Sequence, residues 1–317
     1  MKKEEAFSLY RQMVRIRRFE EELFNLFLKR PMPGSMHQYI GEEAVAVGVC
    51  AHLTRQDYVT STHRGHGHCI AKGVALNAIM AEMFAKSTGC CKGMGGSMHI
   101  ADFDAGMLGA NGIVGAGIPI ATGAAWTCQL RHPGRVSVVF FGEGAANEGA
   151  FHEGINLAAV WKLPAVFVCE NNLYNFSVHY KRTMVLDDIA GRAAAYGIPG
   201  FVVDGMDLVA VYDAAREAVE RARQGGGPTL MECKTYRYMG HSRFEPAGYR
   251  SKEEVAEWKK RDPIPMFRQT LISRFQALSA DFEKIDLEVS REMEEAVAFA
   301  ERSPDPGPED YRKYIFA

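Results

Sequence analysis

The chain has 317 residues, of which 47% are hydrophobic and 24% are charged, and its formal net charge is −2. These values are typical of a soluble globular protein, and they exclude a general electrostatic attraction to nucleic acid or to anionic membranes. No run of about 18 uncharged apolar residues is present to span a membrane, and the start of the chain lacks the apolar core of a signal peptide. The seven cysteines are odd in number and several lie in apolar stretches, so we expect reduced thiols in a cytoplasmic protein.

The first part of the chain reads as helices separated by loops that are rich in glycine and histidine. Residues 4–29 carry apolar side chains near helical spacing with charges between them, which predicts one or two packing helices. Shorter helices are expected around 41–51 and 75–85. The Gly- and His-rich segments would let the backbone approach a ligand closely. They cover residues 61–73, 89–99 and 109–123.

The rest of the chain alternates apolar runs with helical patterns. The expected elements are a strand–helix–strand unit at 136–172, strands at 201–203 and 229–234 around a helix at 208–223, a polar loop at 239–250, and two amphipathic helices within about 252–302. This alternation predicts an α/β fold with a doubly wound, mostly parallel sheet. We expect a single domain over residues 1–317, with helical extensions at 1–30 and 252–317.

Two polar residues end successive apolar runs inside the unit at 136–172. Glu143 follows the first run within Gly-Glu-Gly, and Asn172 ends the second within Asn-Asn. Parallel neighbouring strands bring their carboxyl ends together, which is where open α/β sheets bind ligands. A carboxylate and an amide oxygen beside glycine-rich backbone suit a hard divalent cation that holds a diphosphate.

Other phosphate-binding motifs fit this segment poorly. A nicotinamide fingerprint needs a third glycine where the chain has Asn147, and a P-loop needs Gly-Lys-Ser/Thr at the turn. An ordinary βαβ unit whose acidic residue caps the helix remains a structural alternative, which the Asn-Asn at the next strand end disfavours.

The segment at 142–172 resembles the thiamine-diphosphate signature, in which Gly-Asp-Gly precedes Asn-Asn by nearly thirty residues. Residues 5–265 as a whole resemble α subunits of two-subunit 2-oxo acid dehydrogenase E1 components, a family that includes pyruvate, branched-chain and acetoin dehydrogenases. The likeness extends to the glycine-rich run at 89–99, to 111–116 and to Thr-Tyr-Arg-Tyr-Met-Gly-His-Ser at 235–242.

The resemblance assigns roles to particular residues, and it implies thiamine diphosphate and Mg²⁺ as cofactors. Glu143 and Asn172 would ligate the metal together with the backbone carbonyl of Tyr174. The diphosphate would contact the backbone of Gly144 and Ala145 and the guanidinium of Arg64, and His63 would lie near it. The main chain of Gly112 and Val114 would contact the aminopyrimidine.

The metal site departs from the family pattern at one position. The family has Asp where this chain has Glu143, which keeps the charge but moves the carboxylate by one methylene. Since Mg²⁺ demands near-ideal octahedral geometry and Ca²⁺ is more forgiving, we expect a divalent-ion site with altered preference or affinity. A Glu143→Asp variant with unchanged metal dependence would contradict that expectation.

Histidines are concentrated in the run Thr-His-Arg-Gly-His-Gly-His at 62–68. A transition-metal site is one interpretation, but the spacing matches no common zinc motif and no cysteine pair stands nearby. The other interpretation is that these histidines transfer protons beside a cofactor. By resemblance His66 and His241 would be catalytic and move protons at the substrate's carbonyl oxygen, and His241 would also bind the cofactor. We expect structural roles for three further histidines, His68, His99 and His152.

The resemblance also implies a substrate and partners. Family members that act on pyruvate usually carry an aromatic residue at the position of His63, so this run looks more like acetoin dehydrogenase α subunits, with pyruvate dehydrogenase E1 α as the alternative.

The resemblance implies that a β subunit would supply the carboxylate that activates the cofactor, in an α₂β₂ heterotetramer. This assembly would pass the acyl group of a small carbonyl substrate to a lipoyl-bearing E2. A degenerate scaffold subunit is the non-enzymatic alternative, for which Glu143 is the only sign.

The polar loop at 239–250 follows a strand and can lie at the mouth of a site. In mitochondrial relatives a serine at the position of Ser242 is phosphorylated, but nothing in this chain implies a kinase, and ordering of the loop by the cofactor is the favoured role. Arg243 and Arg250 are expected to be solvated or to face an acidic carrier domain.

Overall fold

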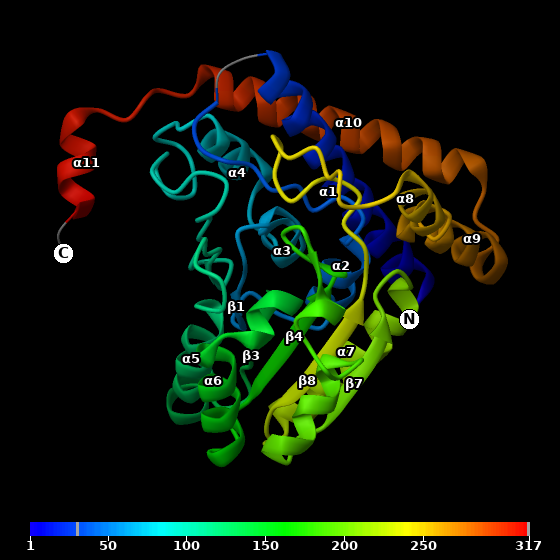
Figure 1. Ribbon diagram of the computed structural model, residues 1–317. Coiled ribbons are helices and arrows are strands. Elements are labelled where there is room, and N and C mark those ends of the chain that lie inside the picture. Colours follow the sequence, from blue (N-terminus) through cyan, green and yellow to red (C-terminus); the bar gives the residue numbers. More distant parts are fainter. Residues whose placement is uncertain (30–31, 316–317) are drawn as a thin grey trace.

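A six-stranded, all-parallel sheet forms the centre of the protein, which we describe from a computed structural model that places residues 1–29 and 32–315 (Figure 1). The strand order is β2-β1-β3-β4-β8-β7. The strands are β1 Tyr58–Thr60, β2 Met107–Gly109, β3 Ser137–Gly142, β4 Ala165–Asn171, β7 Gly200–Asp204 and β8 Thr229–Lys234. The predicted doubly wound parallel sheet is therefore confirmed.

The central strands are apolar throughout because both faces of the sheet are covered. Successive side chains of β3 alternate between two cores: Val138 and Phe140 face one, whereas Val139 and Phe141 face the other. Helices α1 Lys3–Lys29, α2 Glu43–Cys50 and α7 Leu208–Arg223 pack on the first side. Helices α5 Gly117–Arg131 and α6 Gly149–Val160 pack on the second, beside β3 (Figure 1).

Several elements differ from the prediction. The histidine run enters a helix, α3 His66–Lys72, and the glycine-rich segment at 109–123 leads into α5, so both segments are partly helical. The strands β1 and β2 were not expected. Short 3-10 helices also occur, and the first of them, η1 Glu143–Asn147, starts directly at the end of β3. The others are η2 Tyr180–Arg182 and η3 Ile189–Tyr196, and a small hairpin pairs β5 Tyr174–Asn175 with β6 Val178–His179.

The two helical extensions lie together. The amino-terminal segment is one helix, α1, and the tail forms three helices up to residue 302 where two were expected, α8 Lys252–Lys259, α9 Pro263–Phe275 and α10 Ser279–Arg302. Helix α9 begins at an Asp262 cap followed by proline and ends at Gln276 in the left-handed conformation, which separates it from its neighbours. Helix α10 crosses α1 and α4 Leu76–Met83, and α11 Pro308–Ile315 stands away from the body (Figure 1). The outermost residues of the predicted extensions, 30 and 316–317, lie outside the described residues.

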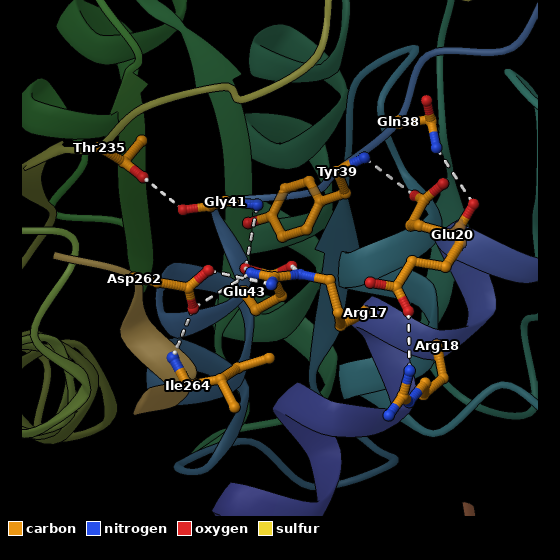
Figure 2. A network of polar contacts seen from close by, with 11 residues as sticks. Arg17, Arg18, Glu20, Gln38, Tyr39, Gly41, Glu43, Thr235, Asp262 and Ile264 are labelled. Atoms are coloured by element: carbon orange, nitrogen blue, oxygen red, sulfur yellow. Dashed lines mark hydrogen bonds and ion pairs between the residues drawn. The ribbon is translucent and has the colours of Figure 1, made fainter. Parts of the chain in front are cut away.

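A polar network fastens α1 to the segment before α2 (Figure 2). The guanidinium of Arg17 contacts the Glu43 carboxylate at 2.6 Å and the Asp262 carboxylate at 3.0 Å, and Glu43 also accepts a hydrogen bond from the Gly41 backbone at 3.1 Å. Nearby, the Glu20 carboxylate accepts the Tyr39 N–H at 3.0 Å. These contacts fix the chain at 37–43, which contributes Glu42 to the cavity described next. Within the described part of the chain, no helix combines the length and the apolar character needed to cross a membrane.

Candidate functional site

A cavity of about 430 Å³ lies at the carboxyl ends of β3 and β4. Its lining includes nine of the eleven predicted site residues: His63, Arg64, Val114, Glu143, Gly144, Ala145, Asn172, Tyr174 and His241. Gly112 lies just outside the lining, between Asn111 and Ile113, which both contribute to it. His66 does not line the cavity. The end of a parallel sheet thus gathers residues that are up to 199 positions apart in the chain, from Glu42 to His241.

Oxygen donors converge at one end of the cavity. Glu143 is the first residue of η1 and is buried, and one of its carboxylate oxygens accepts the Asn172 N–H at 3.2 Å. The Asn172 side-chain NH₂ donates to Glu42 at 3.1 Å, and the Asn172 amide oxygen accepts the Tyr174 N–H at 3.4 Å. Burial raises the pKa of Glu143 to about 7, against the opposing effects of backbone hydrogen bonds and of Arg237 and Arg64.

The surroundings of Gly144 support the view that this end holds a ligand. The amide oxygen of Asn175 lines the cavity and is buried without a hydrogen-bond partner among the described residues. It lies so close to Gly144 that a Cβ there would sit 2.5 Å from it. A carboxylate, two amide oxygens and the nearby backbone form an oxygen-rich donor set, which fits a hard divalent cation.

Two guanidinium groups supply positive charge to the same cavity. Arg64 donates to the backbone carbonyls of Gln38 at 2.6 Å and His241 at 3.0 Å. Burial and the neighbouring charge of Arg237 lower the pKa of Arg64 to about 10, so it remains charged at neutral pH. Arg237 is almost fully buried and donates to the Phe176 carbonyl at 3.0 Å. Together they fit an anionic group such as a diphosphate.

Sequence reasoning missed three residues of this site. Arg237 lies inside the 235–242 motif, so a signal for it was available. Glu42 and His37 lie in segments without a recognised motif, and only the folded chain brings them to Asn172 and to His63. Burial and the charge of Glu170 raise the pKa of Glu42 to about 8.

Three imidazoles meet beside the arginines. The ring centroids of His37 and His63 are 4.7 Å apart, those of His37 and His241 are 5.0 Å apart, and those of His63 and His241 are 5.2 Å apart. Burial, followed by the positive charge of Arg64, lowers the pKa of His37 to about 3, of His63 to about 2 and of His241 to about 3. All three rings are therefore neutral at physiological pH, and neutral imidazoles can accept protons or ligate metals.

The structure gives His66 a different place from the one predicted. Its ring is fully buried, with Nδ1 2.9 Å from the Glu20 carboxylate and Nε2 2.9 Å from the Ser97 hydroxyl. Both nitrogens are thus occupied away from the cavity, and the expectation that His66 moves protons at a substrate is corrected: it braces α3 against α1 and the loop at 89–99.

The histidines expected to be structural have local partners. His68 is buried between the Ser61 hydroxyl, 2.7 Å from Nδ1, and the Glu170 carboxylate, 3.0 Å from Nε2. His152 contacts the Tyr196 hydroxyl at 2.5 Å. His99 is exposed and lies against Gly112 in the loop at 89–99.

One buried carboxylate shapes the glycine-rich loop at 89–99. Glu82, on α4, accepts four backbone N–H groups of this loop, at 2.8 to 3.0 Å, from Cys91, Gly93, Gly95 and Gly96. A buried carboxylate that accepts this many backbone donors fixes the path of the chain. The loop is therefore held in shape by a residue outside the motif itself.

The loop at 239–250 has no helix or strand, as predicted, but the prediction for Arg250 is wrong. Arg250 is buried and donates to three consecutive backbone carbonyls at the start of the loop, those of Arg237, Tyr238 and, at 2.7 Å, Met239. Arg243 is half-buried, donates to the Phe27 carbonyl at 2.9 Å and stacks over the Phe27 ring. The loop is tied to the body through these arginines, which holds His241 at the cavity.

The chain resembles known proteins over nearly its full length. A family model described as "Dehydrogenase E1 component" matches residues 11–309. The α subunit of acetoin:2,6-dichlorophenolindophenol oxidoreductase from Bacillus subtilis is 54% identical over 304 residues, which cover 96% of this chain and 91% of the relative. The subunit of the same name from Cupriavidus necator is 47% identical over 309 residues, 97% of this chain and 93% of the relative.

A second group of relatives carries another name. The pyruvate dehydrogenase E1 component subunit alpha-3 of Arabidopsis thaliana, a chloroplastic protein, is 43% identical over 321 residues, which cover 99% of this chain and 75% of the relative. The family model and both groups of relatives agree on the family. The chain belongs to the dehydrogenase E1 component family and corresponds to its α subunits.

Proposed function

We propose that this chain is the α subunit of an E1 component that uses thiamine diphosphate and a divalent cation to cleave acetoin. The observation that carries the proposal is the meeting of Glu143 and Asn172 at one end of a cavity whose other charged groups include Arg64 and Arg237. An oxygen-rich cation site beside two guanidiniums fits a metal-bound diphosphate. The two relatives named for acetoin are 54% and 47% identical to the chain, against 43% for the Arabidopsis pyruvate dehydrogenase subunit.

The residues that would hold the cofactor follow from the lining of the cavity. Glu143, Asn172 and the carbonyl of Tyr174 would ligate the cation, and the unpartnered Asn175 amide oxygen is a further donor at that end. Gly144 and Ala145 would present backbone to the diphosphate. When bound, thiamine diphosphate supplies a nucleophilic carbon and a sink for an electron pair.

Cleavage of acetoin needs a proton acceptor that cleavage of a 2-oxo acid does not need. Acetoin carries a hydroxyl on the carbon next to its carbonyl, and breaking the bond between these carbons releases acetaldehyde only if that hydroxyl loses its proton. A 2-oxo acid loses CO₂ and has no such proton to lose. His63 and His241 both line the cavity, and their ring nitrogens are the groups that would take the hydroxyl proton.

We further propose that a β subunit completes the site in an α₂β₂ assembly, and that a lipoyl-bearing E2 accepts the acyl group. Support comes from the exposed apolar side chains at the cavity rim and on or next to α5 and α6, here called the α5–α6 patch, in which Trp126 and Trp161 contact one another. Its exposed members are Ile113, Val114, Ile120, Trp126, Leu130, Leu157, Val160 and Trp161. Contiguous exposed aromatic and aliphatic side chains of this kind mark protein interfaces.

The test is cofactor binding and turnover by the chain produced with its β subunit. We expect thiamine diphosphate to bind only with a divalent cation present, and acetoin to be turned over faster than pyruvate. Glu143→Gln should weaken cofactor binding by roughly tenfold or more, because it removes a charged ligand. Glu148→Gln is the matched control, since Glu148 lines the same cavity but lies exposed at the start of α6.

Each alternative predicts a different outcome. Faster turnover of pyruvate would transfer the assignment to pyruvate dehydrogenase. Absence of cation-dependent cofactor binding in the α–β complex would support a degenerate scaffold subunit and overturn the proposal.

A further inference from the structure

The three imidazoles of His37, His63 and His241 form a cluster that the proposed reaction does not require as a set. They come from three separate segments: the stretch before α2, the turn after β1 and the loop after β8. Each ring offers one nitrogen, and these three nitrogens all lie within 4.8 Å of one another. Tetrahedral zinc holds its nitrogen ligands about 2.0–2.1 Å from the ion, so small side-chain rotations would bring these three rings to one metal.

The ring nitrogens have unused bonding capacity. His37 Nδ1 and His241 Nδ1 are both buried and have no hydrogen-bond partner among the described residues. Buried polar atoms are nearly always satisfied by a partner, a water or an ion. A buried, unpartnered nitrogen on each of two adjacent rings therefore points to a ligand that the protein itself does not supply.

Charged groups of both signs lie beside the cluster. The cavity beside it is lined by four carboxyl groups, those of Glu42, Glu143, Glu148 and Glu170, against two guanidiniums. One guanidinium, that of Arg64, is engaged with two backbone carbonyls. Arg64 and Arg237 both act on the three imidazoles, so a divalent ion there would be held by the ring nitrogens and not by a surplus of negative charge.

We propose that His37, His63 and His241 bind a divalent transition-metal ion, with Zn²⁺ as the expected species and a fourth coordination position open toward the cavity. The oxygen donors around Glu143 prefer hard ions such as Mg²⁺, whereas imidazole suits Zn²⁺, so one cavity contains two cation sites of different chemistry. Mg²⁺ does not compete for the imidazole site.

A consequence for catalysis rests on the proposed function. His63 and His241 line the cavity that would receive thiamine diphosphate and substrate. Zinc on these rings occupies the nitrogens that would accept the substrate's proton and fixes the loop that carries His241. We therefore expect zinc and thiamine diphosphate to weaken each other's binding several-fold, as linkage requires.

The test uses Co²⁺ as a spectroscopic probe on the full chain, freed of any histidine tag and in excess Mg²⁺. We expect one Co²⁺ per chain, displaced by Zn²⁺, with visible d–d absorption and no thiolate-to-cobalt charge-transfer band. His63→Gln and His241→Gln should each weaken Co²⁺ binding at least roughly tenfold. This readout needs no thiamine diphosphate, so its failure is separate from failure of the proposed function.

Matched controls separate this cluster from the other candidate in the described chain, Glu82 with Cys90 and Cys91. Cys91→Ser and His152→Gln should leave Co²⁺ binding unchanged. A thiolate charge-transfer band, or equal binding by the wild type and both cluster variants, would overturn the proposal. Thermal unfolding of each variant verifies the fold, and because either cluster variant alone tests the site, one that fails to fold leaves the other informative.

Discussion

Gly142 and Gly144 lie on either side of Glu143, yet their surroundings differ. A Cβ at Gly144 would meet the Asn175 amide oxygen at 2.5 Å, whereas a Cβ at Gly142 would meet no atom within 4 Å. Neither glycine has a positive φ, so alanine strains the backbone at neither position. Only one of the two glycines is therefore needed for space.

This contrast gives a matched pair of substitutions. Gly144→Ala should displace Asn175 and weaken cation-dependent thiamine diphosphate binding by about tenfold, at a stability cost of about 1–3 kcal/mol for overpacking. Gly142→Ala should bind the cofactor as the wild type does. Isothermal titration calorimetry on the α–β complex measures both, and equal affinities in the two variants would contradict the assigned role of Gly144.

At the scale of elements, one ion pair joins three parts of the sheet layer. The Asp57 carboxylate, just before β1, contacts Arg223 at the end of α7 at 2.6 Å and accepts the Val136 N–H, just before β3, at 3.0 Å. Burial alone would raise the pKa of Asp57, but the hydrogen bonds from Arg223 and from the backbone of Thr54 and Val136 lower it below its ordinary value of 3.8.

The sign of this pKa shift fixes a pH dependence. A carboxyl whose folded-state pKa is lowered stabilises the protein above its unfolded-state pKa, and the effect is lost as pH falls through the folded-state value. Asp57→Asn should therefore lower the free energy of unfolding by about 2 kcal/mol at pH 7, with a smaller difference below about pH 4. Urea unfolding at both pH values measures this difference. Asp213→Asn removes the exposed pair with Arg216 and should change stability by less than about 1 kcal/mol.

The helices differ in how well the sequence predicts them. The helix at 208–223 was predicted with the correct bounds because its apolar spacing is regular, Asp207 caps its start and glycines follow its end. Helix α5 was hidden because glycine and alanine dominate its buried face: its Ile118 packs so closely on Gly154 of α6 that a Cβ there would lie 2.8 Å away. Small residues at a close helix contact give no apolar stripe, so periodicity could not reveal this helix.

From the residues alone the site was predictable where they follow a strand, whereas His63, Arg64, Val114 and His241 were named through the family resemblance. Glu143 and Asn172 were found because each ends an apolar run, and the parallel sheet brings those ends together. His37 and Glu42 join the site through tertiary contacts between segments distant in sequence, for which no local pattern exists. The resemblance placed His66 at the substrate, and the histidine-rich run itself gives no sign of which rings the start of α3 turns inward.

At the scale of the whole molecule, the α5–α6 patch predicts how the chain assembles. Trp126 and Trp161 contact one another, with ring centroids 5.0 Å apart, and Leu130 and Val160 beside them are about two-thirds exposed. Charged residues here should disfavour burial against a partner. We expect Leu130→Glu combined with Val160→Glu to weaken association with the β subunit at least roughly tenfold while the α chain stays folded.

Native mass spectrometry and circular dichroism measure the two parts of this prediction. Leu287→Glu is the control, because Leu287 is an equally exposed leucine on α10, away from the patch. An unchanged α₂β₂ population in the patch variant would place the β subunit elsewhere on the surface.

The pairing of the first helix with the tail has a consequence for how the chain is made. Helix α1 packs on α10 through Phe7 and Tyr10 against Phe282, and through Arg11 and Arg15 against Glu292. The residues that cover this face of α1 are thus synthesised some 270 positions later. At ordinary elongation rates the nascent chain presents an uncovered apolar helix for roughly 15 to 60 s, during which binding by a chaperone would compete with aggregation on the ribosome.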